Sequence, residues 1–181
     1  MLRIRAYRHP EVRNPKRLCY GRSDMSLLEP AESSVGFYLE QPPPRTIYCS
    51  PSLRCFSVAK LAYPEHMIVV DERIQEMNFG TWEQVRWSEI PKAEIDSWTE
   101  DIINFTPPKG ESFAQVITRV RDFCLEKHHE QSVFLITHSG VLKALRFLEN
   151  PVVASALVNF DFARPVDFLF DPKTNGLNGL D

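Results

Sequence analysis

The hydrophobic positions of this chain form short extended runs that alternate with longer segments of helical periodicity. Runs typical of β-strands lie at residues 2–7, 46–49, 67–70, 132–137 and 166–170. Helices are expected at residues 31–41, 50–63, 112–127 and 141–148, with one or two short ones between 81 and 104. The alternation predicts one domain over residues 1–181, with a three-layer α/β/α fold and a mostly parallel central sheet.

The first strand has a mixed character. From Leu2 to Tyr7 apolar and polar residues alternate, which predicts one buried face and one face in contact with water. The runs 67–70 and 133–136 are apolar at every position, as in strands that are covered on both faces. The first strand therefore fits poorly into a sheet that is covered throughout.

Local signals mark the ends of the helices. Ser50 and Pro51 suit the N-cap and the first residue of the second helix. Ser112, with Gln115 three residues later, predicts a capping box at the start of the most regular helix. The prolines at 42–44 are expected to stop the first helix, because proline cannot continue one.

Composition places the chain among ordinary globular proteins, with 43% hydrophobic residues, 25% charged residues and a formal net charge of −3. No basic stripe is present, so neither nucleic acid nor a membrane surface is expected as a partner. There is no signal-peptide core and no apolar run that could span a membrane, which predicts a cytoplasmic protein. The sequence leaves a homodimer open, and the tail after residue 174 is expected to fray.

Neither a metal site nor a cofactor is expected. The four cysteines, at 19, 49, 55 and 124, have no zinc-binding spacing, and we interpret them as buried reduced thiols, with a disulfide left open. The adjacent His128 and His129 would point in different directions on a helix. Residues 81–104 carry all three tryptophans, Trp82, Trp87 and Trp98, for which packing in a core or lid is favoured over a ring-binding site.

Chemically versatile side chains follow the carboxyl ends of four predicted strands. They are Arg8 and His9 after the first strand, Ser50 and Arg54 after the second, Glu76 after the third, and His138 after the run 132–137. Ligands of open α/β sheets bind beyond these ends, so we expect the side chains to share one rim.

This set of residues suits a tetrahedral phosphate. Two guanidinium groups and a helix N-terminus bind a dianion, and their positive charge keeps a nearby imidazole neutral. A neutral histidine can attack phosphorus, which divides hydrolysis into the formation and the breakdown of a phosphohistidine. The second histidine would stabilise the transferring phosphoryl group. The glutamate would protonate the leaving alcohol and then deprotonate water.

The same residues resemble the motifs of the histidine phosphatase superfamily, whose fold is phosphoglycerate mutase-like. Arg8-His9-Pro10 resembles the family's Arg-His-Gly signature, and Ser50-Pro51-Ser52-Leu53-Arg54 resembles its Ser-Pro-x-x-Arg block. Three further blocks follow in family order: Glu76 to Gly80 as Glu-x-x-Phe-Gly, Gly110 to Ser112 as Gly-Glu-Ser, and Thr137 to Gly140 as Thr-His-Gly/Ser-Gly. The resemblance covers about residues 1 to 145.

The resemblance implies a buried first strand and a role for each matching residue. His9 would accept the phosphoryl group, Glu76 would donate the proton, and the phosphate would lie among Arg8, Arg54 and His138. Further substrate contacts would come from Asn14, Arg22 and Ser139. The stretch 18–24 looks most like that of the alpha-ribazole phosphatases.

Two positions depart from the family pattern. Pro10 replaces the usual glycine, which stiffens the loop after His9 and removes one backbone donor. The family's asparagine six residues after the histidine is Pro15 here, and Asn14 lies one residue short of that position.

The expected function is that of a metal-independent phosphomonoesterase that acts on a small phosphorylated metabolite, with alpha-ribazole phosphate as one candidate. A phosphoglycerate mutase-type phosphotransferase is the nearest alternative, although the chain is shorter than the family's mutases. A non-catalytic phosphate-binding domain would be expected to have lost one of His9, Arg54, Glu76 and His138, and all are present. A nucleotide-binding module would need a G-x-G-x-x-G loop, which the sequence lacks.

Overall fold

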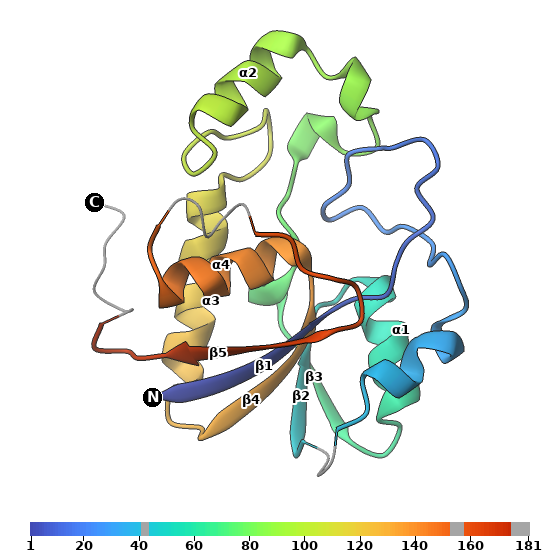
Figure 1. The fold of residues 1–181 in the computed structure, drawn as a ribbon, viewed down its shortest axis with the longest axis vertical. Coiled ribbons are helices and arrows are strands. Elements are labelled where there is room, and N and C mark those ends of the chain that lie inside the picture. Colours follow the sequence, from blue (N-terminus) through green and yellow to red (C-terminus); the bar gives the residue numbers. More distant parts are fainter. Residues whose placement is uncertain (41–43, 153–157, 175–181) are drawn as a thin grey trace.

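The computed structural model describes residues 1–40, 44–152 and 158–174, and these contain a five-stranded sheet in the order β3-β2-β4-β1-β5 (Figure 1). The strands are β1 Leu2–Arg8, β2 Thr46–Cys49, β3 Met67–Val70, β4 Ser132–Thr137 and β5 Pro165–Phe170. Neighbouring strands pair in parallel except β1 and β5, which are antiparallel. The mostly parallel sheet is therefore confirmed.

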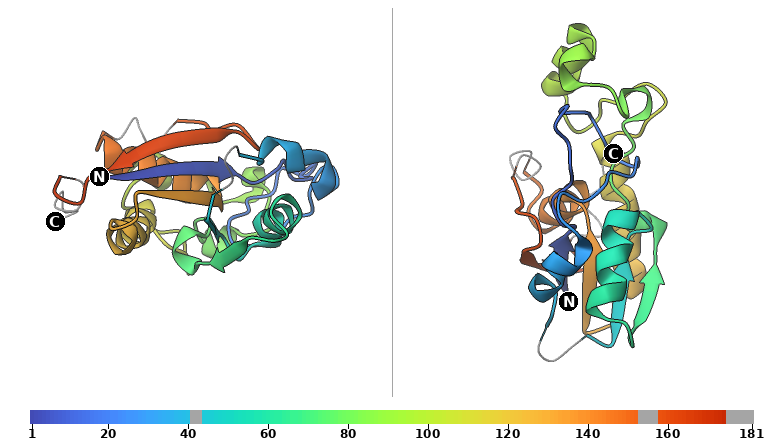
Figure 2. Two further views of the ribbon diagram at one scale, coloured as in Figure 1. Left: turned by 90° about the horizontal axis from the view of Figure 1, so that it is seen from below. Right: turned by 90° about the vertical axis from the view of Figure 1, so that its right-hand side faces the viewer.

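Helices cover both faces of this sheet. On one face lie α3 (Phe113–Lys127) and α4 (Ser139–Glu149), and on the other lie α1 (Leu53–Ala62) and the 3-10 helix η1 (Ala31–Phe37) (Figure 2). The other helical elements are η2 Glu72–Ile74, η3 Gly80–Trp82, η4 Trp87–Glu89 and α2 Lys92–Glu100. The predicted α/β/α layering is confirmed.

The periodicity of β1 matches its two environments. Leu2, Ile4 and Ala6 are buried against α3 and α4. On the opposite face Tyr7 is buried against the α1 layer, whereas Arg3 is exposed. Arg5 is partly exposed and forms ion pairs with Glu40 and Asp167, each at 2.8 Å. The strand is thus central in the sheet, and its wet face is confined to the end that the α1 layer does not cover.

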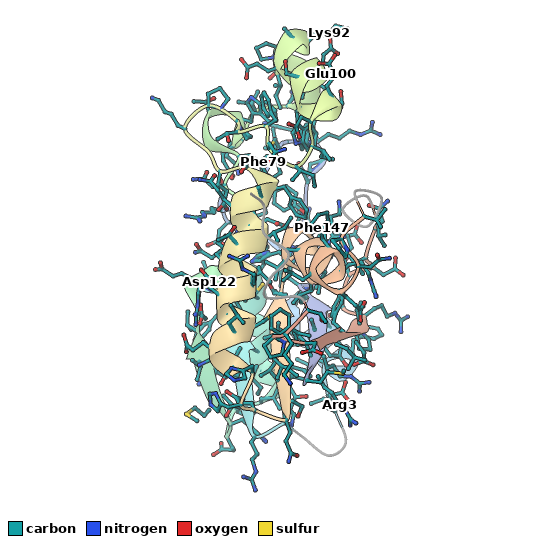
Figure 3. The ribbon with its side chains drawn as sticks, turned by 90° about the vertical axis from the view of Figure 1, so that its left-hand side faces the viewer. Arg3, Phe79, Lys92, Glu100, Asp122 and Phe147 are labelled. Carbon is teal, nitrogen blue, oxygen red and sulfur yellow. The ribbon has the colours of Figure 1, made fainter. Side chains whose placement is uncertain are left out.

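The segment from Phe79 to Phe105 forms a separate small core above the carboxyl ends of the parallel strands (Figure 1). Trp82 is its centre, with 2% of its surface exposed, and packs with Cys19 and Ile90. Figure 3 shows α2, between Lys92 and Glu100, at the opposite end of the molecule from Arg3. Core or lid packing is therefore correct for Trp82, and the four cysteines are free and buried, as predicted.

Two of the predicted helices differ from the structure. The expected helix at 31–41 is the 3-10 helix η1, which ends at Phe37 because Tyr38 turns into the core, where its hydroxyl donates to the Arg8 carbonyl at 2.7 Å. The expected start at Ser50-Pro51 is wrong, since α1 begins at Leu53 with Ser52 as its N-cap. Of the prolines that were expected to stop the first helix, residues 42 and 43 lie outside the described residues, as does the tail after residue 174.

The N-terminus of α3 has the predicted capping box, in which the Ser112 hydroxyl accepts from the Gln115 amide at 3.3 Å and the Gln115 side chain accepts from the Ser112 amide at 2.8 Å. We expect Ser112→Ala to lower the free energy of unfolding by about 1 kcal/mol, because the Gln115 amide loses its partner. Ser112→Thr should retain most of the stability. Urea denaturation of the three proteins tests this, and equal midpoints would show that the capping box contributes nothing.

Candidate active site

The structure brings the predicted catalytic residues to one edge of the sheet. The imidazole rings of His9, which follows β1, and His138, which follows β4, lie 5.2 Å apart between centroids. Arg54 in the first turn of α1 approaches His138 Nδ1 to 3.2 Å. Glu76 and Arg8 line one cavity beside them. The common rim is therefore correct, and the roles of these residues remain predictions.

His9 is buried, neutral and held in one tautomer. Its amide donates to the Thr137 carbonyl at 2.9 Å, and its Nδ1 lies 2.6 Å from the Pro10 carbonyl. A carbonyl can only accept, so the proton is on Nδ1 and the lone pair is on Nε2. Burial, together with the charges of Arg54 and Arg8, lowers the pKa of His9 to about 3. Pro10 has no amide N–H to donate, but its carbonyl oxygen accepts the hydrogen bond that fixes the His9 ring.

His138 has the opposite tautomer. Arginine can only donate, so Nδ1 accepts from Arg54, and Nε2 then donates to the Ser50 hydroxyl at 2.7 Å. Burial, followed by the charge of Arg54, holds the pKa of His138 well below its ordinary value. The Ser50 hydroxyl also accepts from the Ser52 amide at 3.3 Å, so Ser50 connects His138 to the N-cap residue of α1.

Within the described part of the chain, backbone carbonyl groups hold each arginine and leave its Nε without a partner. Arg54, 1% exposed, donates to the carbonyls of Ser23 at 2.9 Å and Gly21 at 2.5 Å. Arg8 donates to the Phe160 carbonyl at 2.8 Å, and its guanidinium lies 3.6 Å from the centre of the Phe162 ring. Among the described residues, Nε of both arginines is buried without a hydrogen-bond partner. Unpaired buried donors are rare, and two beside two histidines suit an anion.

Glu76 is held at the N-terminus of α4. The Gly140 amide donates to its two oxygens at 3.1 and 3.2 Å, and the Met77 amide donates to Oε1 at 2.9 Å. A Cβ atom at Gly140 would lie 2.1 Å from Oε1, so a side chain at this position would displace the carboxylate. This close approach gives the glycine of the Thr-His-Ser-Gly block a physical role.

The three predicted substrate contacts lie in different places. Ser139 lines the cavity beside Glu76. Asn14 bonds the backbone of Leu18 with both ends of its amide, at 2.9 and 2.8 Å, and so fixes its own loop. Arg22 is largely exposed and approaches Glu111 to 3.5 Å. Of these residues, the structure brings only Ser139 to the cavity.

Sequence reasoning did not assign a role to Glu83. Its carboxylate accepts from four backbone amides at 3.0–3.1 Å, those of Gly21, Arg22, Ser23 and Phe79. Burial opposes the charge, but the Ser23 side chain and these backbone amides hold the pKa of Glu83 below its ordinary value. Glu83 therefore fixes the loop whose carbonyls receive Arg54. In the sequence, the signal that could have drawn attention to Glu83 is its position directly after Trp82.

One cavity of about 260 Å³ reaches this edge of the sheet, where Arg8 and Glu76 line it. Arg8, Glu76, Ser139, Gly140 and Lys143 form its polar part, and Tyr20 lies at its edge, near both arginines. Trp87 and Trp98 also line it, so these two tryptophans face the cavity, unlike Trp82. Across the described ranges, no three His, Cys, Asp or Glu side chains cluster as metal ligands, and no helix is long and apolar enough to cross a membrane.

The fold and site define an α/β protein in which two buried histidines and two arginines meet at the carboxyl edge of a mostly parallel sheet. The family model of the histidine phosphatase superfamily (branch 1) matches residues 4–156, and the chain belongs to this family.

Two curated relatives and one solved structure are similar to this chain at low sequence identity. A Hydrogenobacter thermophilus protein named as a phosphoserine phosphatase is 31% identical over 55% of this chain and 52% of its own length. The adenosylcobalamin/alpha-ribazole phosphatase of Escherichia coli is 27% identical over 55% of this chain and 53% of its own. The chain thus spans about half the length of these two relatives. The alpha-ribazole phosphatase structure from Shigella flexneri has a TM-score of 0.79 at 22% identity, covering 91% of this chain and 89% of that chain, which supports the fold.

The buried histidines predict that acid weakens the fold. The pKa of His9 is about 3 in the folded protein and ordinarily 6.5, so the unfolded chain binds the proton first as the pH falls. The contribution of neutral His9 to the free energy of unfolding is therefore fully present above pH 6.5 and is lost as the pH falls toward 3. The free energy of unfolding then changes by up to about 1.4 kcal/mol per pH unit for each such histidine.

His9→Asn should reduce this slope by about 1.4 kcal/mol per pH unit between pH 4.5 and 6, as measured by urea unfolding at several pH values. His129→Asn, which changes an exposed histidine, is the control and should leave the slope as it is. An unchanged slope in His9→Asn would contradict a buried neutral His9.

Proposed function

We propose that this protein hydrolyses phosphomonoesters through a phosphohistidine at His9. The observation that carries the proposal is the His9 Nε2 lone pair in a site where the two arginines each leave Nε unused. A phosphate placed there would receive charge-assisted hydrogen bonds from both guanidinium groups while Nε2 attacks phosphorus. Membership of the histidine phosphatase superfamily supports this reading.

The proposed reaction has two balanced steps. In the first, Nε2 of His9 forms a bond to phosphorus, the ester P–O bond breaks, and the leaving oxygen takes a proton from Glu76. In the second, water attacks phosphorus, Glu76 takes the water proton, and the P–N bond breaks to release inorganic phosphate. Arg8, Arg54 and His138 would hold the equatorial oxygens throughout. No metal ion takes part, so activity should persist in EDTA.

The substrate is proposed to be a small phosphorylated metabolite. Alpha-ribazole phosphate is a candidate because the Escherichia coli relative is named for it. A cytoplasmic location is also proposed, since all four cysteines are free and buried, as is usual for proteins in a reducing compartment.

His9→Ala should lower phosphate release from p-nitrophenyl phosphate by at least about a thousandfold, because the nucleophile is removed. Quenching in alkaline detergent, in which the P–N bond of a phosphohistidine survives, with a substrate radiolabelled on its phosphate should trap label on the wild-type chain and none on the variant. Circular dichroism confirms that the variant is folded. Turnover by His9→Ala at a rate near that of the wild type would exclude His9 as the nucleophile.

Glu76→Gln should affect alkyl phosphates far more than aryl phosphates. Glutamine can still accept from the Gly140 amide but cannot donate a proton as an acid, and an alkoxide leaves poorly without one. We expect a loss of about a hundredfold or more in kcat/KM for ethyl phosphate, and a much smaller loss for p-nitrophenyl phosphate. Equal losses on both substrates would remove Glu76 from the acid role.

A further inference from the structure

The cavity of the candidate site has two chemically distinct ends. Arg8, Glu76 and Ser139 lie at the end that faces the proposed phosphate. The opposite wall is made of apolar and aromatic side chains: Met77, Phe79, Trp87, Trp98, Ile102 and Phe113. Because both ends belong to one cavity, a phosphomonoester bound at the first end would place its alcohol half against this aromatic wall.

The aromatic wall is braced by packing behind it. The rings of Trp87 and Trp98 are stacked, with centroids 5.7 Å apart and an interplanar angle of 19°. Phe79 meets Trp87 edge-on at 5.9 Å and Trp98 at 6.4 Å. Trp82 packs against Trp98 at 5.9 Å and is itself fixed by a 2.6 Å hydrogen bond from Nε1 to Glu94. The ring faces are therefore held in place before any ligand arrives, which reduces the entropy lost on binding.

The exposure of Trp87 indicates that this wall is open to a ligand. Trp87 is 37% exposed although it lies among aromatic neighbours, whereas Trp82 behind it is 2% exposed. An apolar ring left partly in water gains from being covered, and it prefers another aromatic group in stacked or edge-on geometry.

The charges around the cavity argue against a second anionic group on the substrate. Its cationic lining residues are Arg8, which faces the proposed phosphate, and Lys143 in the second turn of α4. Burial lowers the pKa of Lys143, and the nearby Glu76 carboxylate opposes this shift. One such lysine beside a carboxylate is a poor site for a second phosphate.

The size of the cavity also fits a ring. An apolar cavity of about 150 Å³ accommodates benzene. The cavity here, at about 260 Å³, has space for an aromatic ring and for the linking atoms that reach the phosphate end.

We propose that the alcohol half of the substrate carries a planar aromatic ring that packs against the stacked pair Trp87 and Trp98, and that it carries no second phosphate or carboxylate. This inference rests on the proposed phosphatase activity, since the phosphate end of the cavity sets the orientation of the substrate. The tryptophan-bearing segment would then select the substrate, in addition to packing over the end of the sheet.

The test compares 2-naphthylmethyl phosphate with ethyl phosphate, two alkyl esters whose leaving groups need similar protonation. We expect the ring to raise kcat/KM by about 10- to 100-fold, the usual range for one stacked ring. 3-Phosphoglycerate, with its carboxylate, should be hydrolysed no faster than ethyl phosphate. Trp87→Ala should lower the naphthylmethyl-to-ethyl ratio about tenfold, and Trp87→Phe should keep most of it. Leu61→Ala, which removes an exposed apolar side chain on α1, is the control and should keep the wild-type ratio.

Binding gives a second readout that does not depend on turnover. In the His9→Ala variant, calorimetry should show tighter binding of 2-naphthylmethylphosphonate than of ethylphosphonate, and adding Trp87→Ala should remove the difference. A ratio near one in the wild type, a ratio unchanged in Trp87→Ala, or a preference for 3-phosphoglycerate would overturn the aromatic specificity and leave the phosphatase proposal standing. If none of the esters, p-nitrophenyl phosphate included, is hydrolysed, the phosphatase proposal fails, and the phosphonate comparison then decides the ring site alone.

Discussion

The buried charge of Arg54 is the constraint on which the site depends. A guanidinium that is 1% exposed needs hydrogen-bond partners, and here, among the described residues, the carbonyls of Gly21 and Ser23, Nδ1 of His138 and the Asp24 carboxylate provide them for both terminal nitrogens and leave only Nε without one. Those carbonyls face Arg54 because Glu83 holds the amides of the same loop. The arginine thereby sets the tautomer of His138 and, after burial, is the next cause of the low pKa of both histidines.

The same cause keeps both histidines neutral, but different hydrogen bonds orient their rings. Each is buried beside arginines, which disfavours its protonated form. His9 is oriented by the Pro10 carbonyl and keeps its Nε2 lone pair, whereas His138 gives its Nε2 proton to Ser50. The proline that departs from the family pattern does not disturb this arrangement, because the atom it contributes is a carbonyl oxygen that every residue has.

Much of the fold could be predicted because its determinants are local. Strand runs, the capping box at Ser112 and the alternation in β1 depend on neighbouring residues, and the rim of catalytic side chains follows from parallel topology. Other features depend on residues far away in the chain. Ser50 has every local feature of an N-cap, but Ser52 holds that position, and the Ser50 hydroxyl accepts from His138, 88 positions away. The contact of Gly140 with Glu76 and the exposure of Trp87 likewise depend on how distant segments meet.

The small core around Trp82 has a consequence for how such a protein can diverge. Because Trp87 and Trp98 belong to a segment with its own packing, these two rings could be exchanged during evolution without rebuilding the sheet that carries the histidines. Glu83 limits this freedom, since it lies in the same segment and secures the loop that receives Arg54. Related proteins with new substrates would therefore vary the tryptophans while retaining the carboxylate beside them.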